Sequence, residues 1–265
     1  MVGDRDGEAY TLNNIGLAWA GLGEMHKALD FYKQALSLFR DLGNRGAEPT
    51  TLNNIAGTLA ALGDLHSAIE FYKQALPLYR DIRDQSGEAT TLNNIGLVWA
   101  ALRDQQRALE CYEQALPLFR EVGHRNGEAS VLNNLGEVWR RLGEYRNALE
   151  LYAQALPQFR ALGNQEGEAA TLNNMALIYF KDGDLERAAN SFWQIIPIMK
   201  AMGAVADESL VRYNLANTLK AMGNLPEATA QVEQALALLR SRGLPQNAGG
   251  VTVAQMEAFL AGLRG

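Results

Sequence analysis

The chain has 265 residues, of which 48% are apolar and 20% are charged, and its formal net charge is -6. This balance is typical of a folded protein and differs from the apolar-poor composition of a disordered chain. Nucleic-acid-binding domains usually carry a basic surplus, so the acidic balance argues against a nucleic-acid partner. Because the chain has a single cysteine, an intrachain disulfide is excluded. One cysteine and three histidines also leave few ligands for a metal site.

The first eight residues are charged and lack the apolar core of a signal peptide. No apolar run is long enough to span a bilayer, so no membrane partner is expected. A single cysteine is also compatible with a reducing compartment. We therefore expect a cytoplasmic protein.

A repeat of 40 residues dominates the sequence and holds without slippage for six copies. Its most regular segment is Leu-Asn-Asn followed by an apolar residue, first seen at residues 12–15. A glutamate recurs at the same spacing, at Glu8, Glu48, Glu88, Glu128, Glu168 and Glu208. The pattern defines six repeats, over 8–47, 48–87, 88–127, 128–167, 168–207 and 208–243. Residues 1–7 are expected to form a loop like those between repeats.

Each repeat is predicted to form two helices, which in the first copy cover about Glu8–Leu22 and Glu24–Leu42. Gly23 marks the turn between them and Gly43 the end of the second helix. Polar residues two positions before the recurring glutamate are the expected N-caps, at Asp6, Ser86 and Asn126. No segment alternates with period two over the length of a strand, so we expect no sheet.

Helical periodicity separates a buried stripe from an outer face in the first helix of each repeat. Leu12, Ile15 and Gly16 fall on the buried stripe, whereas Asn13 and Asn14 fall on the opposite side. Small residues on both helices, such as Gly16 and Ala28, are expected to let the pair approach closely. Prolines inside the second helices are expected to bend them without breaking them, at Pro77, Pro117, Pro157 and Pro197.

The repeat pattern stops after residue 243. Residues 244–250 are predicted to be a linker, and residues 251–265 a short helix that caps the array. Thr252 with Gln255 three positions later forms a capping-box pattern. The predicted apolar face of this helix consists of Met256, Phe259, Leu260 and Leu263.

The order of small, aromatic and glycine positions resembles the tetratricopeptide repeat over residues 8–243. In the first copy the matching residues are Ile15, Gly16, Trp19, Gly23, Ala28, Tyr32 and Ala35. The 40-residue length, with Leu-Asn-Asn, is similar to spindle-orientation adaptors, kinesin light chains and repeat arrays of bacterial signalling proteins. The resemblance implies an all-α, right-handed superhelical solenoid of six helix-turn-helix repeats plus a capping helix. It also implies a non-enzymatic scaffold or sensor that binds a protein or peptide in its concave groove.

Motifs for catalysis and cofactor binding are not found in the sequence. There is no Gly-rich phosphate loop and no His-Glu-x-x-His, and the three histidines are isolated. Cys111 occupies a variable helix position, which is a better interpretation than a nucleophile. We therefore expect no enzyme activity, no cofactor and no metal.

Asparagine is unusually concentrated, because 11 of its 19 occurrences lie at two repeat positions. The first set is Asn13, Asn53, Asn93, Asn133 and Asn173, and the second is Asn14, Asn54, Asn94, Asn134, Asn174 and Asn214. Asparagine is a mediocre helix former, so its repetition requires a reason. One reason is hydrogen bonding between neighbouring repeats. The other is a ladder of amides, each a donor and an acceptor, that binds a peptide backbone in the concave face. On the second hypothesis, the Asn14 set is free of bonds within the stack.

Residues between the asparagines vary along the array and are expected to form specificity pockets. The apolar members are Leu17, Leu97 and Leu177, and the basic members are Arg140, Arg141, Lys181, Lys220 and Arg212. This distribution predicts a ligand that is part apolar and part acidic.

Two other functions are compatible with the pattern. The first is an array that serves only for structure or self-association, as a homo-oligomer formed through an uncapped N-terminal end. The second is the regulatory arm of a larger bacterial signalling enzyme, with an ATPase switch or a caspase-like protease domain.

Overall fold

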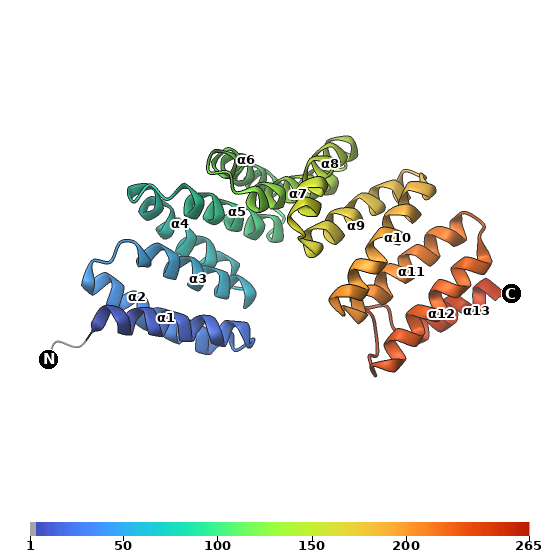
Figure 1. Ribbon diagram of the computed structural model, residues 1–265, viewed down its shortest axis with the longest axis horizontal. Coiled ribbons are helices and arrows are strands. Elements are labelled where there is room, and N and C mark those ends of the chain that lie inside the picture. Colours follow the sequence, from blue (N-terminus) through green and yellow to red (C-terminus); the bar gives the residue numbers. More distant parts are fainter. Residues whose placement is uncertain (1–3, 265) are drawn as a thin grey trace. The chain divides into compact units, whose positions relative to one another are not determined.

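The computed structural model describes residues 4–264, which form helices joined by short turns, with no β-strand in that range. Figure 1 shows the helices as consecutive pairs along the chain. Their bounds are α1 Arg5–Gly21, α2 Met25–Leu42, α3 Ala47–Ala61, α4 Leu65–Asp81, α5 Gln85–Ala101, α6 Gln105–Glu121, α7 Arg125–Leu142, α8 Tyr145–Leu162, α9 Gln165–Lys181, α10 Leu185–Met202, α11 Val205–Ala221, α12 Leu225–Ser241 and α13 Val253–Arg264. The predicted all-α array of helix pairs is confirmed.

The chain divides into two compact parts, and the division falls within α7. The N-terminal part ends at Val138 and the C-terminal part begins at Trp139. In the N-terminal part, α1 packs against α2, α2 against α3, and so on through α6. In the C-terminal part, the same succession runs from α8 through α13. From α1 to α6 and from α8 to α13, consecutive helices therefore contact one another, as expected of stacked repeats.

The first helices begin before the predicted position, and their caps differ from those expected. Asp4 caps α1, because its Oδ1 accepts a hydrogen bond of 2.9 Å from the backbone N–H of Gly7. Asp84 caps α5 in the same way, accepting from Gly87 at 2.9 Å. The predicted N-caps at Asp6, Ser86 and Asn126 are therefore wrong, since these residues lie in the first turn of their helices. The predicted loop over 1–7 is also too long, because α1 starts at Arg5.

The prolines inside the second helices do not interrupt them. Helices α4, α6, α8 and α10 continue past Pro77, Pro117, Pro157 and Pro197 to their last turns. The absence of a break at these positions agrees with the sequence-based expectation, and the bend stays a prediction.

The two helices of a repeat pack closely where a small residue faces an aromatic ring. A Cβ added at Gly16 would lie 2.7 Å from Cδ1 of Tyr32, which is closer than van der Waals contact permits. Gly96 has the same relation to Tyr112, at 2.5 Å from Cε1. Ala28 on the facing helix is fully buried. The predicted close approach of the helix pair is confirmed, and the tyrosine ring is the group that requires it.

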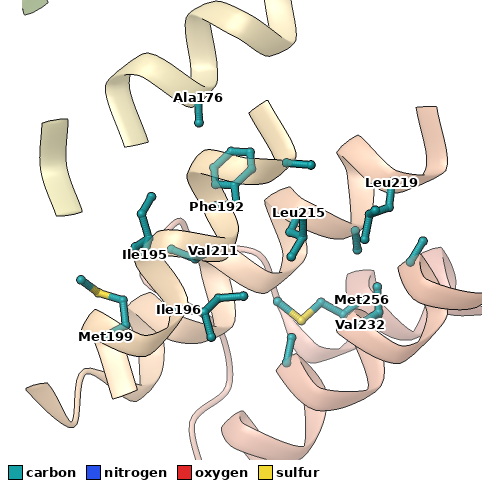
Figure 2. Close-up of a cluster of buried hydrophobic side chains, with 14 of the residues drawn as sticks. Ala176, Phe192, Ile195, Ile196, Met199, Val211, Leu215, Leu219, Val232 and Met256 are labelled. Carbon is teal, nitrogen blue, oxygen red and sulfur yellow. The ribbon is translucent and has the colours of Figure 1, made fainter. Parts of the chain in front are cut away.

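The C-terminal helix α13 covers the last repeat. Figure 2 shows Met256 among the buried side chains of α11 and α12, near Leu215 and Val232. Met256 is fully buried and Leu263 nearly so. The capping box is formed, because the N–H of Thr252 donates to Gln255 Oε1 at 2.8 Å and the N–H of Gln255 donates to Thr252 Oγ1 at 3.2 Å. The structure thus agrees with the proposed role of α13 as a cap.

Candidate functional site

An open groove of about 580 Å³ lies in the N-terminal part. Its lining residues come from α1 to α5, and α3 contributes the largest share of them. The lining residues are Ala20, Met25, Tyr32, Thr50, Asn53, Asn54, Gly57, Thr58, Ala61, Tyr72, Tyr79, Asp84, Ser86, Gly87, Thr90 and Asn94. Three asparagines that the sequence singled out, Asn53, Asn54 and Asn94, therefore meet in one groove.

Two tyrosine hydroxyls in the groove are held by neighbouring amides and hydroxyls. Tyr72 hydrogen-bonds Asn94, and burial raises the pKa of Tyr72 to about 12. The Tyr79 hydroxyl lies 3.3 Å from Thr50 Oγ1 and accepts from Asn53 Nδ2 at 3.4 Å. Burial also raises the pKa of Tyr79. Both hydroxyls consequently stay protonated and keep a hydrogen to donate at neutral pH.

Members of the Asn13 set connect neighbouring repeats. The Oδ1 of Asn13 accepts from Thr51 Oγ1 at 3.3 Å, one repeat further along the chain. Asn53 Nδ2 donates to Thr91 Oγ1 at 2.8 Å across the next boundary. The hypothesis that these amides hold the stack in register is thus supported for Asn13 and Asn53.

Members of the Asn14 set also take part in these contacts. Asn54 Nδ2 donates to Asn13 Oδ1 at 3.2 Å, and Asn134 Nδ2 donates to Asn93 Oδ1 at 2.9 Å. The expectation that the Asn14 set is free of bonds within the stack is therefore wrong for Asn54 and Asn134, and also for Asn94, which hydrogen-bonds Tyr72 of the preceding repeat. The reason is that the two sets lie on adjacent helical positions, so the amide of one repeat reaches the amide of the next. An amide has two N–H groups and a carbonyl oxygen, so one such bond does not use its full capacity.

Replacing Asn53 by Ala is expected to lower the free energy of unfolding by about 1–2 kcal/mol, because its contacts with Thr91 and Tyr79 are half-buried. Replacing Asn14, which is exposed, should change stability by a few tenths of a kcal/mol at most, and alanine is the better helix former there. Urea denaturation of the two variants beside the unmodified chain measures the difference. Equal stability of both variants would contradict the role of Asn53 between repeats.

Arg212 does not belong to a basic binding surface, contrary to the sequence-based expectation. Its guanidinium bonds Glu208 Oε1 at 2.8 Å and Gln231 Oε1 at 2.7 Å, and only 12% of its side chain is exposed. The repeat register explains this, since residue 212 occupies the position of the buried Leu52 and Leu132. Arg212 thus lies on the buried stripe of α11 and neutralises a buried carboxylate.

Two other predicted basic residues contact aromatic side chains of the protein itself. Lys181 Nζ bonds the Tyr145 hydroxyl and lies 5.0 Å from the centroid of that ring. Lys220 Nζ lies 4.9 Å from the centroid of Phe259 in α13. Arg140 and Arg141 lie in the last turn of α7. Lys181 and Lys220 are thus partly engaged within the protein, and an acidic ligand segment stays a prediction.

The three predicted apolar contact residues lie at the surface of their helices. Leu17, Leu97 and Leu177 are exposed, at 57%, 46% and 38%. None of the three belongs to the lining of the groove, although Gly57 at the equivalent position does. Their assignment to a ligand surface stays a prediction.

The sequence-based set of contact residues lacks Gly57 and Tyr79, although each carried a signal. Gly57 lies at the variable position between the asparagines, where Leu17 and Leu97 have a larger side chain. Tyr79 replaces the phenylalanine found in Phe39 and Phe119, and so adds a hydroxyl. A comparison of each repeat with the others would have identified both departures.

A second, smaller groove of about 330 Å³ lies in the C-terminal part and has a different character. The positions of Thr50 and Tyr79 are occupied there by Ala170 and Met199, and the carboxylates of Glu166 and Asp207 lie among the lining residues. The hydroxyl-rich surface is therefore a property of the N-terminal groove.

Exposed ion pairs recur at the boundaries between repeats, as suggested by the recurring glutamate. Arginine Nε lies 2.6–2.8 Å from the glutamate Oε1 eight residues later in Arg40–Glu48, Arg80–Glu88, Arg120–Glu128 and Arg160–Glu168. Because the arginines are about half exposed, each pair contributes little to stability, about 0–1 kcal/mol.

Within residues 4–264, no cluster of side chains suited to a metal ion is found. The described helices include none that is both long and apolar enough to cross a bilayer. The Cys111 thiol is partly buried, and burial raises its pKa to about 11, which disfavours the reactive thiolate.

Family models of the tetratricopeptide repeat match most of the chain. One matches residues 47–121 and 127–201, and another matches residues 9–42 and 211–241. The chain therefore belongs to the tetratricopeptide repeat family. No curated protein matches the sequence at a significant level.

Solved structures of several repeat proteins are similar to this fold. BtubC from P. vanneervenii is 22% identical with a TM-score of 0.74, covering 83% of this chain and 92% of that one. The tetratricopeptide-sensor protein PH0952 from Pyrococcus horikoshii is 17% identical with a TM-score of 0.83, covering 96% of this chain but 38% of that one. A Rap protein complexed with Competence and Sporulation Factor is 16% identical with a TM-score of 0.69, covering 97% and 75%. At these identities the similarity concerns the fold.

Proposed function

We propose that this protein is a non-enzymatic scaffold or sensor that binds an extended segment of a partner protein in its N-terminal groove. The observation that carries the proposal is the convergence of Asn53, Asn54 and Asn94 with several hydroxyls on one open groove. Amides and hydroxyls both donate and accept hydrogen bonds, which suits the alternating N–H and C=O groups of a peptide backbone.

The lining of the groove is nearly uncharged, which favours a peptide segment with few charged side chains over a strongly charged ligand. Asp84 is the one charged residue in the lining, and its Oδ1 already accepts the N–H of Gly87 at the start of α5. The similar Rap structure is a complex with Competence and Sporulation Factor, which agrees with ligand binding by an array of this fold. Micromolar affinity is expected, because a few backbone contacts of about 0.5–1.5 kcal/mol each must also offset the ordering of the ligand.

The test begins with a displayed library of random peptides of about 15 residues, which is longer than the extended segment that the three repeats lining the groove could contact. Peptides selected on the unmodified chain are then titrated calorimetrically against that chain and against a double variant that carries both Asn54→Ala and Asn94→Ala. The double variant should bind about 10-fold or more weakly, because two backbone contacts are lost.

The matched control for that titration is Gln114→Ala. Gln114 is exposed on α6, and its amide bonds only the Glu110 carbonyl of its own helix, at 2.9 Å. The Gln114→Ala variant should bind the selected peptides with the same affinity as the unmodified chain. A library that yields no groove-dependent peptide, or an Asn54 and Asn94 double variant with unchanged affinity, would refute the proposed function.

Self-association through the N-terminal end is a second candidate, favoured by the outer face of α1. Leu12 and Ile15 are half-buried, whereas Leu52 and Ile55 at the equivalent positions of α3 are fully buried. Leu22 at the end of the same helix is 73% exposed. An exposed apolar helix face of this kind is suited to packing against a further helix. Formation of a homo-oligomer through this face stays a prediction.

A further inference from the structure

The groove is deepened by a missing side chain at Gly57. Leucine occupies this repeat position at residues 17, 97 and 177, and Glu137 and Asn217 also carry long side chains there. A Cβ added at Gly57 would lie 3.5 Å from the Tyr72 hydroxyl oxygen, which is ordinary van der Waals contact. The backbone conformation is helical, so glycine is not required there by the fold. A methyl group is therefore accommodated at this position, which lines a groove of about 580 Å³ and where the chain itself supplies no side chain.

The walls of this space combine apolar and polar groups. Ala20, Met25 and Ala61 contribute apolar surface, and the Tyr72 hydroxyl and the Asn54 amide contribute polar atoms. Tyr72 is positioned by its hydrogen bond to Asn94 on the neighbouring repeat. The groove that contains Gly57 is thus lined by side chains of three successive repeats.

The charge of the lining restricts what can enter. No lysine or arginine lines the groove, and its one charged residue is the carboxylate of Asp84. An acidic side chain would lose its hydration there without meeting a cation. An uncharged side chain of moderate size meets both the apolar wall and the hydroxyl and amide groups.

We infer that Gly57 opens a specificity subsite that accepts one uncharged side chain, about the size of leucine or glutamine, from the bound peptide. This inference rests on the proposed function and names the feature by which the groove distinguishes its ligands. The incoming side chain occupies the place that leucine takes on the neighbouring repeats and excludes water from the Tyr72 hydroxyl. The Asn54 and Asn94 amides bind the backbone on either side of it.

The decisive variant is Gly57→Leu, which fills the subsite with the residue of the neighbouring repeats. Peptides selected from the random library on the unmodified chain should bind this variant at least 10-fold more weakly by calorimetry. The melting temperature should be equal or higher, because leucine is a better helix former than glycine and its counterparts Leu17 and Leu97 are tolerated at the surface. Lost binding therefore cannot be attributed to unfolding.

Two further variants make the test specific. Gly262→Leu places the same change at an exposed helical glycine of α13, outside the lining of the groove, and should leave affinity unchanged. Gly57→Ala should cause a smaller loss than Gly57→Leu, because a methyl group fills only part of the space. The selected peptides should share one uncharged residue, and its replacement by aspartate should weaken binding about 10-fold or more.

The outcomes separate the subsite from the proposed function. Peptides that bind Gly57→Leu as tightly as the unmodified chain, yet lose affinity in the Asn54 and Asn94 double variant, would overturn the subsite and leave the groove function intact. Selected peptides that share an acidic residue at the position sensitive to Gly57→Leu would overturn its chemical assignment. A library without groove-dependent binders would overturn the proposed function itself.

Discussion

Removing residues 250–265 is expected to lower the free energy of unfolding by about 3–6 kcal/mol and to make the chain self-associate. The deletion exposes the surface that Met256 and Leu263 cover, and full burial of each such side chain contributes about 1.5–3 kcal/mol. Phe259 adds an edge-to-face contact with Tyr213, with ring centroids 5.3 Å apart. Thermal melts and analytical ultracentrifugation of the truncated chain measure both effects.

The control for the deletion is Glu257→Ala, which changes α13 without removing its apolar face. Glu257 pairs with Arg240 at the surface, where both side chains are about half exposed. Loss of an exposed pair should cost less than about 1 kcal/mol. A truncated chain that stays monomeric and as stable as the Glu257→Ala variant would show that α13 is not a cap.

Replacing Arg212 by Leu is expected to destabilise the C-terminal part by about 3–5 kcal/mol, although leucine is the residue of the other repeats at this position. The substitution leaves the Glu208 carboxylate, whose side chain is 7% exposed, without its cation. Breaking a buried ion pair from one side is costly, because the remaining carboxylate loses a hydrogen-bonded cation and is itself poorly exposed to water. Urea denaturation measures the loss.

A second substitution should restore the stability lost in Arg212→Leu. In four of the other repeats the equivalent glutamate pairs with an arginine eight residues earlier, as in Arg160–Glu168 at 2.7 Å. That position holds Lys200 here, and Lys200, Glu208 and Arg212 line the same cavity. Lys200→Arg with Arg212→Leu recreates the arrangement of the other repeats and should come within about 1 kcal/mol of the unmodified chain.

The single variant Lys200→Arg serves as the control for this rescue and should change stability by less than about 0.5 kcal/mol. Failure of the double variant to recover would show that Glu208 needs Arg212 in particular. Unchanged stability of Arg212→Leu alone would show that the ion pair contributes nothing to the fold.

Much of the fold could be predicted from the sequence, because it depends on local periodicity. The 40-residue period defined the helix pairs and the stripe that Leu12, Ile15 and Gly16 represent in the first repeat. This stripe is fully buried in the second repeat, at Leu52 and Ile55, whereas Leu12 and Ile15 themselves are half-buried. The capping box at Thr252 likewise requires only residues three positions apart. The N-caps were predicted two residues late, since Asp6 and Asp4 are both suitable residue types and only the backbone geometry distinguishes them.

The place of Arg212 in the repeat indicated a buried position, whereas its charge indicated the surface. Its position is that of a buried leucine. Burial of an arginine depends on whether a carboxylate and an amide reach it, and Gln231 comes from a different helix. Such a partner cannot be inferred from one helix alone.

The sequence by itself determined the architecture of this protein, namely the number of helix pairs, their close packing at Gly16 and the capping helix. Only the tertiary structure decided the roles of the asparagines and the place of the groove. Asn54 reaches Asn13 and Asn53 reaches Thr91 across 41 and 38 residues of chain, and a hydrogen bond depends on distances of a fraction of an ångström. The open space at Gly57 depends likewise on the side chains of three repeats together, because a groove is a property of the packed surface and not of any one helix.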